Sequence, residues 1–173
     1  MAFLVDIAKA IESKFSGAVK ETVAEGKLPH LVVEAARICE ICEYLKSDGD
    51  LAFDFLSAIA GVDNGEQLEV VYFLYSYSKH HSLAVKTKIP KTDPVVPSVV
   101  TVWPAADWHE RETFDLMGIR FDGHPDLRRI LLPPDWEGYP LRKDYKYPTS
   151  YDGIVLRRDE KDWADPGPEE LYK

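Results

Sequence analysis

The sequence predicts an α+β fold: a single small sheet with packed helices, followed by a long irregular arm rich in proline and aromatic residues. Apolar residues recur at helical spacing in the first half, and runs of strand length there are rich in β-branched and aromatic residues. Almost no periodicity follows residue 122. We therefore expect an α+β core domain over residues 1–122 and an extended partner-binding arm over residues 123–173.

The first third of the chain predicts two helices that flank a pair of strands. Apolar residues at helical spacing indicate a helix over residues 2–14. Two short strands at 18–24 and 28–33 follow, joined by a turn that contains a glycine. An apolar stripe at helical spacing indicates a second helix over residues 34–46.

The strongest sheet signal lies in the next forty residues. Residues 68–77 are β-branched and aromatic on both faces, as in a strand that is covered on both sides. Residues 83–89 alternate apolar and polar side chains, which indicates a half-exposed partner strand in a hairpin. Residues 51–62 fit a helix and a strand alike, and we expect a helical turn that runs into a strand.

A proline-rich break precedes the last predicted helix, near residues 104–117. Pro104 suits the first helical position, and Gly118 suits the position just after the end. From residue 123 onward the chain holds seven of the 12 prolines, together with two tryptophans and several tyrosines. Disordered tails are usually poor in aromatic residues. We therefore expect this arm to become ordered only against another protein.

Charge and hydropathy exclude several classes of function. The net charge of −9 disfavours a nucleic-acid binder, which needs a basic face, and disfavours direct adhesion to anionic lipids. No stretch approaches the roughly 20 apolar residues of a membrane-spanning helix. The N-terminus reads as an amphipathic helix and not as a signal peptide, so we expect a cytoplasmic location.

The C-x-x-C pair, Cys39 and Cys42, is the first candidate for chemistry. In thiol oxidoreductases the reactive cysteine lies at a helix N-terminus, where the helix dipole lowers its pKa. Here Cys39 is expected more than a turn inside a helix, and no second cysteine pair completes a zinc or iron–sulfur site. We interpret both residues as small core side chains, with a free-standing thiol oxidoreductase as the alternative.

Other motifs that carry chemistry are incomplete or absent. His109-Glu110 begins a zinc-protease pattern, but Thr113 stands where its second histidine is required. His80 and His81 are expected in a solvated turn, where adjacent residues point to opposite faces. The two common nucleotide-binding glycine motifs are missing, so we expect no cofactor or metal in this chain.

The helix around residues 108–118 is unusually rich in charge. Four charged residues fall within six positions, and Arg111 and Asp115 are spaced for an i,i+4 ion pair. Trp108, Phe114 and Met117 share the helix and leave little room for a purely solvated face. On these grounds alone the segment favours protein recognition moderately.

The same region resembles the signature of the C-type subunit of respiratory complex I, the NADH:quinone oxidoreductase. That pattern reads E-R-E-x-x-D-x-x-G-I, then G-H-P-D-L-R-R-I-L, then P-L-R-K-D, and this chain matches it nearly without gaps over about 40 positions. The resemblance is weaker over the N-terminal part, for example at Asp54-Phe55-Leu56 and Val62-Asp63, and fades after about Tyr147.

This resemblance implies a non-redox subunit in the peripheral arm of the complex, on the cytoplasmic side of the membrane, beside the D-type subunit that helps form the quinone pocket. It implies no catalytic, cofactor-binding or metal-binding residue here, with FMN, iron–sulfur clusters, NADH and quinone on other subunits. The residues implied in partner binding are Glu110, Arg111, Glu112, Asp115, Gly118, His124, Pro125, Asp126, Arg128, Arg129, Pro140, Leu141, Arg142, Lys143 and Asp144.

Two questions stay open in the sequence. Related chains occur in chloroplast-type NAD(P)H dehydrogenases, F420H2 dehydrogenases and membrane-bound hydrogenases, and any of these complexes is an alternative owner. Arg128, Arg129 and Arg142 are expected to dock on the D-type subunit through charge-assisted contacts. The alternative is that they pair only within the chain, with Asp126, Asp135 or Asp144.

Overall fold

The computed structural model describes residues 2–156, which divide into two compact units. The first unit is residues 1–143 and the second is residues 144–173. In the described part of the second unit, β8 (Ser150–Tyr151) and β9 (Ile154–Val155) form a small antiparallel hairpin. Within residues 2–156 no helix is both long and apolar enough to cross a membrane.

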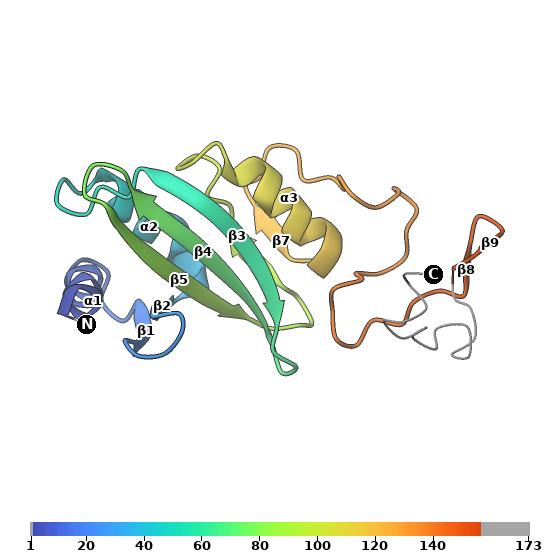
Figure 1. Ribbon diagram of the computed structural model, residues 1–173, viewed down its shortest axis with the longest axis horizontal. Coiled ribbons are helices and arrows are strands. Elements are labelled where there is room, and N and C mark those ends of the chain that lie inside the picture. Colours follow the sequence, from blue (N-terminus) through green and yellow to red (C-terminus); the bar gives the residue numbers. More distant parts are fainter. Residues whose placement is uncertain (1, 157–173) are drawn as a thin grey trace, which may run out of the picture. The chain divides into compact units, whose positions relative to one another are not determined.

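The first unit confirms the predicted α+β class (Figure 1). Its elements, in chain order, are α1 (Ala2–Lys14), β1 (Val19–Val23), β2 (His30–Val33), a 3-10 helix (Ala35–Arg37), α2 (Ile38–Ser47), β3 (Phe55–Asp63), β4 (Leu68–Ser76), β5 (His81–Ile89), β6 (Val95–Pro97), α3 (Ala106–Met117) and β7 (Arg120–Asp122).

A five-stranded mixed sheet in the order β1-β2-β5-β4-β3 is the centre of this unit. The two predicted antiparallel hairpins are present, β1 with β2 and β4 with β5. The hairpins are joined through a parallel pair between β2 and β5, with α2, β3 and β4 in the connection. A separate short parallel pair, β6 with β7, brings the proline-rich break next to the strand that follows α3.

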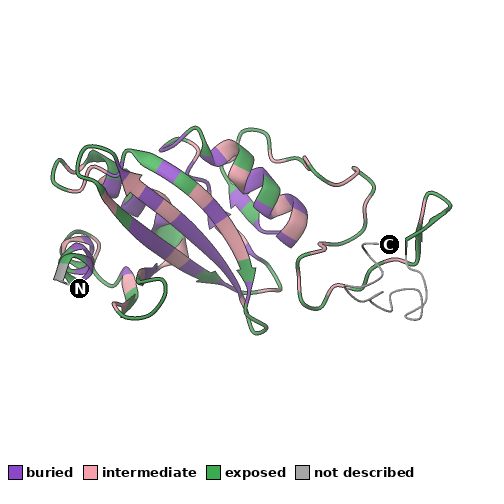
Figure 2. Cartoon of the chain, viewed as in Figure 1, coloured by how far each residue is buried: buried purple, intermediate pink, exposed green. Residues whose placement is uncertain are grey.

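The hydrophobic core lies between the sheet and the helices. Alternate side chains of β4 and β5 are fully buried on one face, among them Leu68, Val70, Tyr72 and Val85. The buried stripes along these strands are visible in Figure 2. Helix α2 adds Ile38, Ile41, Cys42 and Leu45 to the same core cluster, which explains why its apolar residues recur at helical spacing.

Gly61 sets how closely α3 approaches the sheet. A Cβ at this position of β3 would lie 2.9 Å from Thr113 Cγ2 and 3.0 Å from Met117 Cγ, both on α3. The missing side chain therefore lets the helix pack directly on the edge strand. This contact fixes where the charged residues of α3 lie in the fold.

Some boundaries differ from those predicted. The strand expected within residues 51–62 is present as β3. The turn before it is a single one at residues 48–52, closed by the bond from Ala52 N–H to Asp48 O at 2.7 Å, and the chain is irregular from there to Phe55. Helix α3 begins at Ala106, with Pro104 in the preceding turn. His80 is exposed as expected, but His81 is not in a solvated turn. Its ring packs between Phe3 and Phe53, and Nε2–H donates to Leu51 O at 2.6 Å.

Candidate functional site

The charged residues of α3 are buried against the rest of the first unit. Glu110 and Asp115 are fully buried and Arg111 is 4% exposed, whereas Glu112 lies on the solvent side. Buried carboxylates and guanidinium groups must be hydrogen-bonded to be tolerated. The partners of these three residues define the site.

Asp115 holds the segment that follows His124 on the end of α3. Its Oδ2 accepts three backbone N–H donors, from Ile130, Leu131 and Leu132, at 2.9, 2.7 and 3.0 Å. Its Oδ1 accepts the Arg129 guanidinium at 2.8 Å. Burial by itself would raise the pKa of Asp115, but these donors together lower it below its ordinary value. Asp115 is therefore an ionised anchor for residues 129–132.

Arg129 and Arg142 bind carbonyl oxygens at the C-terminal end of α3 and in the chain that passes it. Arg129 donates to the carbonyls of Trp136 and Gly138 as well as to Asp115. Arg142 donates to Met117 O at 2.6 Å and Gly118 O at 3.3 Å. A cation at the last carbonyls of a helix satisfies their lone pairs and complements the helix dipole. Both arginines thus have intrachain partners, and the contacts described here are to Asp115 and backbone carbonyls, whereas the alternative to docking named Asp126, Asp135 or Asp144.

Tyr139 lies between these two guanidinium groups. Its ring centre is 5.4 Å from the Cζ of Arg129 and 4.9 Å from that of Arg142, within the range of cation–π contacts. The same ring lies directly over Gly118, which ends α3 with a left-handed backbone (φ 68°) as its position in the sequence predicted. Tyr139 was not recognised from the sequence, because nothing local links it to the helix end.

Arg111 does not form the expected ion pair with Asp115. Its Nε donates to Arg128 O at 3.3 Å, and its guanidinium lies 4.9 Å from the centre of the Trp108 ring. Asp115 is already saturated by donors from another segment, which explains the difference. The Arg128 side chain itself pairs with Asp126 at 2.8 Å, and both are largely exposed.

Glu110 joins the loop after β6 to α3. Its Oε1 accepts Val99 N–H at 2.7 Å, and its Oε2 lies 2.6 Å from Ser98 Oγ. Burial raises the pKa of Glu110 to about 7 despite these hydrogen bonds. The buried side chain of His124 lies beside it, with Nε2 at 4.0 Å from Glu110 Oε2 and 3.1 Å from Asp107 Oδ1.

Asp63, the last residue of β3, binds the backbone of Lys143, the last residue of the first unit. Its carboxylate accepts the backbone N–H groups of Gly65 and Lys143 and pairs with Lys91 at 2.8 Å. Burial opposes ionisation, but these donors lower the pKa of Asp63 to about 2. Lys143 is 80 residues away in the chain, so no local pattern in the sequence indicated this role.

The implied partner-binding residues fall into two groups. Gly118 and the three α3 residues Glu110, Arg111 and Asp115 are buried, and His124, Arg129, Pro140 and Arg142 are partly buried. The exposed ones are Glu112, Pro125, Asp126, Arg128, Leu141, Lys143 and Asp144. Docking through these residues stays a prediction, and so does the division of the chain after residue 122. Only the exposed residues can contact a partner without unfolding the segment of residues 123–143.

The placement of the cysteines differs from the prediction. Residues 35–37 form a 3-10 helix, so Cys39 lies in the first turn of α2 and not more than a turn inside it. Burial nevertheless raises the pKa of both thiols, that of Cys42 well above its ordinary value. Both therefore favour the neutral thiol, which is the opposite of what a nucleophilic cysteine needs.

We predict that Cys42 is alkylated at least roughly tenfold more slowly in the folded chain than in denaturant, because it is fully buried and its thiolate is disfavoured. The measurement is the rate of iodoacetamide labelling at mildly alkaline pH, resolved by peptide mass. Cys39, which is partly exposed, is the internal comparison. Labelling of Cys42 as fast as a free thiol would revive the thiol oxidoreductase alternative.

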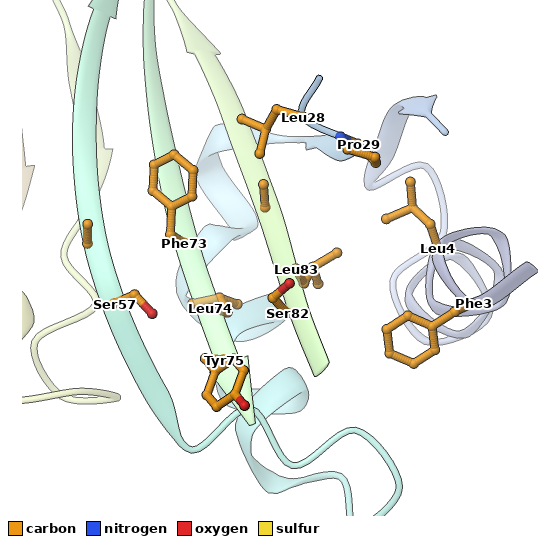
Figure 3. A pocket seen from close by; sticks show the side chains of 12 residues that line it. Phe3, Leu4, Leu28, Pro29, Ser57, Phe73, Leu74, Tyr75, Ser82 and Leu83 are labelled. Atoms are coloured by element: carbon orange, nitrogen blue, oxygen red, sulfur yellow. The ribbon is translucent and has the colours of Figure 1, made fainter. Parts of the chain in front are cut away.

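An apolar groove lies away from these residues, on the sheet (Figure 3). It has a volume of about 530 Å³, and no charged side chain lines it. Phe3 and Leu4 of α1 face Phe73 and Tyr75 of β4 across it. Among residues 2–156, no group of three or more His, Cys, Asp or Glu residues is placed to hold a metal ion.

Comparisons of sequence place these features in a family. Residues 31–151 match the family described as the respiratory-chain NADH dehydrogenase, 30 Kd subunit. A Chloroherpeton thalassium protein, named as the C-type subunit of NADH-quinone oxidoreductase, is 45% identical over 141 residues, which cover 80% of this chain and 59% of that protein. The chain thus spans about three-fifths of that relative's length. A Methylococcus capsulatus protein, named as the combined C/D subunit of the same enzyme, is 40% identical over 151 residues, covering 80% of this chain and 26% of that protein.

Two solved structures share the fold. One is described as Nqo5 of the trypsin-resistant fragment (1-134), with a TM-score of 0.60 and 30% identity, covering 72% of this chain and 98% of that one. The other belongs to a membrane-bound sulfane sulfur reductase, an archaeal respiratory membrane complex, with a TM-score of 0.67 and 28% identity, covering 82% of this chain and 85% of that one.

Proposed function

The chain belongs to the family of the respiratory-chain NADH dehydrogenase 30 Kd subunit, which includes the C-type subunit of NADH-quinone oxidoreductase, and on this premise we propose that it is a structural and assembly subunit. It supplies no redox centre and packs in the peripheral arm of a proton-translocating NADH:quinone oxidoreductase, beside the D-type subunit. FMN, iron–sulfur clusters and the NADH and quinone sites belong to other subunits. The complex holds the chain peripherally at the cytoplasmic side of the membrane.

The observation that carries this proposal is how the buried signature residues are used. The charged side chains of Asp115, Arg129 and Arg142 form hydrogen bonds to backbone groups within residues 116–138. These bonds fix the surface segment that passes over α3. None of these three residues lines the apolar groove on the sheet. Such a segment presents exposed side chains such as Arg128, Leu141 and Lys143 at defined positions, which suits recognition of another protein.

The C/D relative supports the choice of partner. In that protein a region similar to this chain makes up about a quarter of a polypeptide named for both subunits. Covalent fusion keeps two domains at high effective concentration, and it is tolerated when they are neighbours in the assembled state. We therefore place the D-type subunit next to this chain.

The test of this proposal is the Arg128→Ala variant in the native complex. Among residues 2–156, the Arg128 side chain hydrogen-bonds only to Asp126, and it is 69% exposed, so its loss should leave the thermal unfolding of the isolated chain unchanged. If Arg128 docks on the partner, the variant lowers the amount of assembled complex and the quinone reductase activity together. Blue-native electrophoresis and activity per cell measure both.

Asp126→Ala is the matched control. It removes the local partner of Arg128, and it mimics Arg128→Ala if the pair acts within the chain or if Asp126 itself contacts the partner. Loss of assembly in Arg128→Ala together with normal assembly in Asp126→Ala therefore assigns the contact to Arg128. Normal assembly with reduced turnover per complex would move Arg128 into the catalytic path and contradict a structural role. Normal assembly with normal turnover would exclude Arg128 from the interface.

A second candidate function is the equivalent subunit of a related respiratory complex. The likeness to a chain of the sulfane sulfur reductase complex favours it, because this fold thereby occurs in a complex that is named for another reaction. Purification of the native complex separates the two candidates. A co-purifying NADH-oxidising flavoprotein supports the first, and its absence from an intact complex supports the second.

A further inference from the structure

Three exposed side chains, those of Trp108, Arg128 and Leu131, lie along α3 and the segment that passes over it. Trp108 and Leu131 are each 60% exposed, and the Arg128 side chain is 69% exposed. We call these three residues the row. Trp108 belongs to α3, whereas Arg128 and Leu131 belong to the segment that follows β7. The docking proposed above names Arg128 and accounts for neither of the two apolar residues.

The order of the row follows from the contacts of the helix. Residues 108, 111 and 115 are spaced i, i+3 and i+7, so they share one stripe of α3. Arg111 donates to Arg128 O, and Asp115 one turn later accepts the N–H of Leu131. The segment therefore covers the stripe at Arg111 and Asp115 and leaves it open at Trp108. At 1.5 Å per residue, the row extends for roughly 10 Å along the helix axis.

Arg111 holds the first two members of the row in place. Its guanidinium carbon lies 4.9 Å from the centre of the Trp108 ring, and its Nε lies 3.3 Å from Arg128 O. Arg111 is itself buried, with 4% of its surface exposed. An aromatic ring that rests on a buried cation loses little rotational freedom when a partner covers it. Arg111 thus arranges two exposed groups for contact.

The chemistry of the row indicates the surface that would bind it. Tryptophan and arginine are enriched among the few residues that dominate the energy of protein interfaces, and leucine is under-represented there. Trp108 offers a large apolar area with a single N–H donor. Arg128 uses its Nε for Asp126 at 2.8 Å, and within residues 2–156 its two Nη groups form no hydrogen bond. They are therefore available to a carboxylate of a partner.

We propose that the row is the centre of the contact with the D-type subunit. In this contact Trp108 fills an apolar pocket of that subunit, Arg128 binds a carboxylate beside the pocket, and Leu131 covers its edge. The inference rests on the proposed function, which names the partner, and deepens it by naming the chemistry of the partner surface. A second copy of this chain suits the row less well, because two chains of net charge −9 repel each other.

The first experiment is photo-crosslinking in the native complex. Trp108→p-benzoylphenylalanine keeps an aromatic side chain at this position, and after irradiation it should cross-link to the D-type subunit, as identified by mass spectrometry. Tyr77→p-benzoylphenylalanine is the matched control, because Tyr77 is also 60% exposed and lies outside the row. It should give no cross-link to that subunit. A cross-link from position 108 to a different subunit or to a second copy, or none in an assembled complex, would overturn the inference.

The second experiment measures the affinity of the full chain for the purified D-type subunit. Trp108→Ala should weaken binding by about thirtyfold or more, as expected for a residue at the centre of an interface. Trp108→Phe keeps a ring on Arg111 and should retain most of the affinity. Leu131→Ala should have a smaller effect than Trp108→Ala, and Tyr77→Ala should have none. Thermal unfolding of each isolated chain verifies that the exposed substitutions leave the fold intact.

The outcomes separate this inference from the proposed function. If Arg128→Ala impairs assembly while Trp108→Ala binds and assembles as the wild type does, docking stands and the row is not its centre. If Tyr77→Ala weakens binding as much as Trp108→Ala, the effect is not specific to the row, and the inference fails. If Arg128→Ala and Trp108→Ala both leave assembly and turnover normal, the proposed docking fails together with this inference.

Discussion

Replacing Asp115 by alanine is expected to lower the free energy of unfolding by about 3–5 kcal/mol, the usual cost of removing one partner from a buried charged network. The change leaves three backbone N–H groups without their acceptor and removes the carboxylate partner of Arg129, whose guanidinium keeps only carbonyl acceptors. Residues 129–142 should then exchange their amide protons rapidly. Urea denaturation and hydrogen exchange of the isolated chain measure the two effects.

Asp126→Ala provides the comparison for this variant. Asp126 also pairs with an arginine at 2.8 Å, but the pair is exposed to solvent, so its loss should leave the stability nearly unchanged. Because the pKa of Asp115 is lowered, its contribution is present above the ordinary aspartate value and disappears as pH falls below it. Equal stability losses in the two variants would show that Asp115 is not an anchor.

These intrachain contacts bear on how far the sequence could predict the site. Apolar spacing located α1, α2 and the hairpins, and Pro104 and Gly118 indicated the ends of α3, because each of those patterns is local. The parallel pairing of β2 with β5 depends on residues more than 50 positions apart, and the local hydrophobic periodicity of the sequence does not reveal it. The fold class was therefore predictable, whereas the sheet order was not.

The same distinction applies to the signature residues. The motif indicated which side chains matter, but two roles are compatible with an arginine in a proline-rich segment: docking on a partner and bonding within the chain. Arg129 and Arg142 have intrachain partners 14 and 25 residues away, across a break in regular structure that no periodic pattern spans. Only the geometry separates them from Arg128, whose side chain is left exposed.

We predicted that the whole arm from residue 123 becomes ordered only with a partner, and this stays a prediction. The contacts of residues 123–143 indicate which part of the arm it concerns. Segments held by Asp115, Asp63 and the end of α3 have their hydrogen-bond partners already within the first unit. The expectation of partner-dependent order therefore bears chiefly on the second unit, of which residues 157–173 lie outside the described part of the chain.

Gly118→Ala is the second substitution for which we expect a large loss, about 2–5 kcal/mol. Its left-handed backbone conformation costs an alanine about 1–2 kcal/mol. In addition, the new Cβ would overlap the ring of Tyr139, and such overpacking costs about 1–3 kcal/mol. Displacing Tyr139 also removes the ring from between Arg129 and Arg142. Thermal and urea unfolding of the isolated chain measure the total.

Two further variants separate the backbone cost from the clash. Gly123 has a similar backbone (φ 81°), but a Cβ there meets nothing within 4 Å, so Gly123→Ala should show only the conformational cost. In Gly118→Ala/Tyr139→Ala the overlap is gone, and the second substitution should cost less than it does in the wild type. If Gly118→Ala were no more destabilising than Gly123→Ala, Tyr139 would not rest on the end of α3 in solution. The fixed segment on which the docking proposal depends would then lack one of its contacts with the helix end.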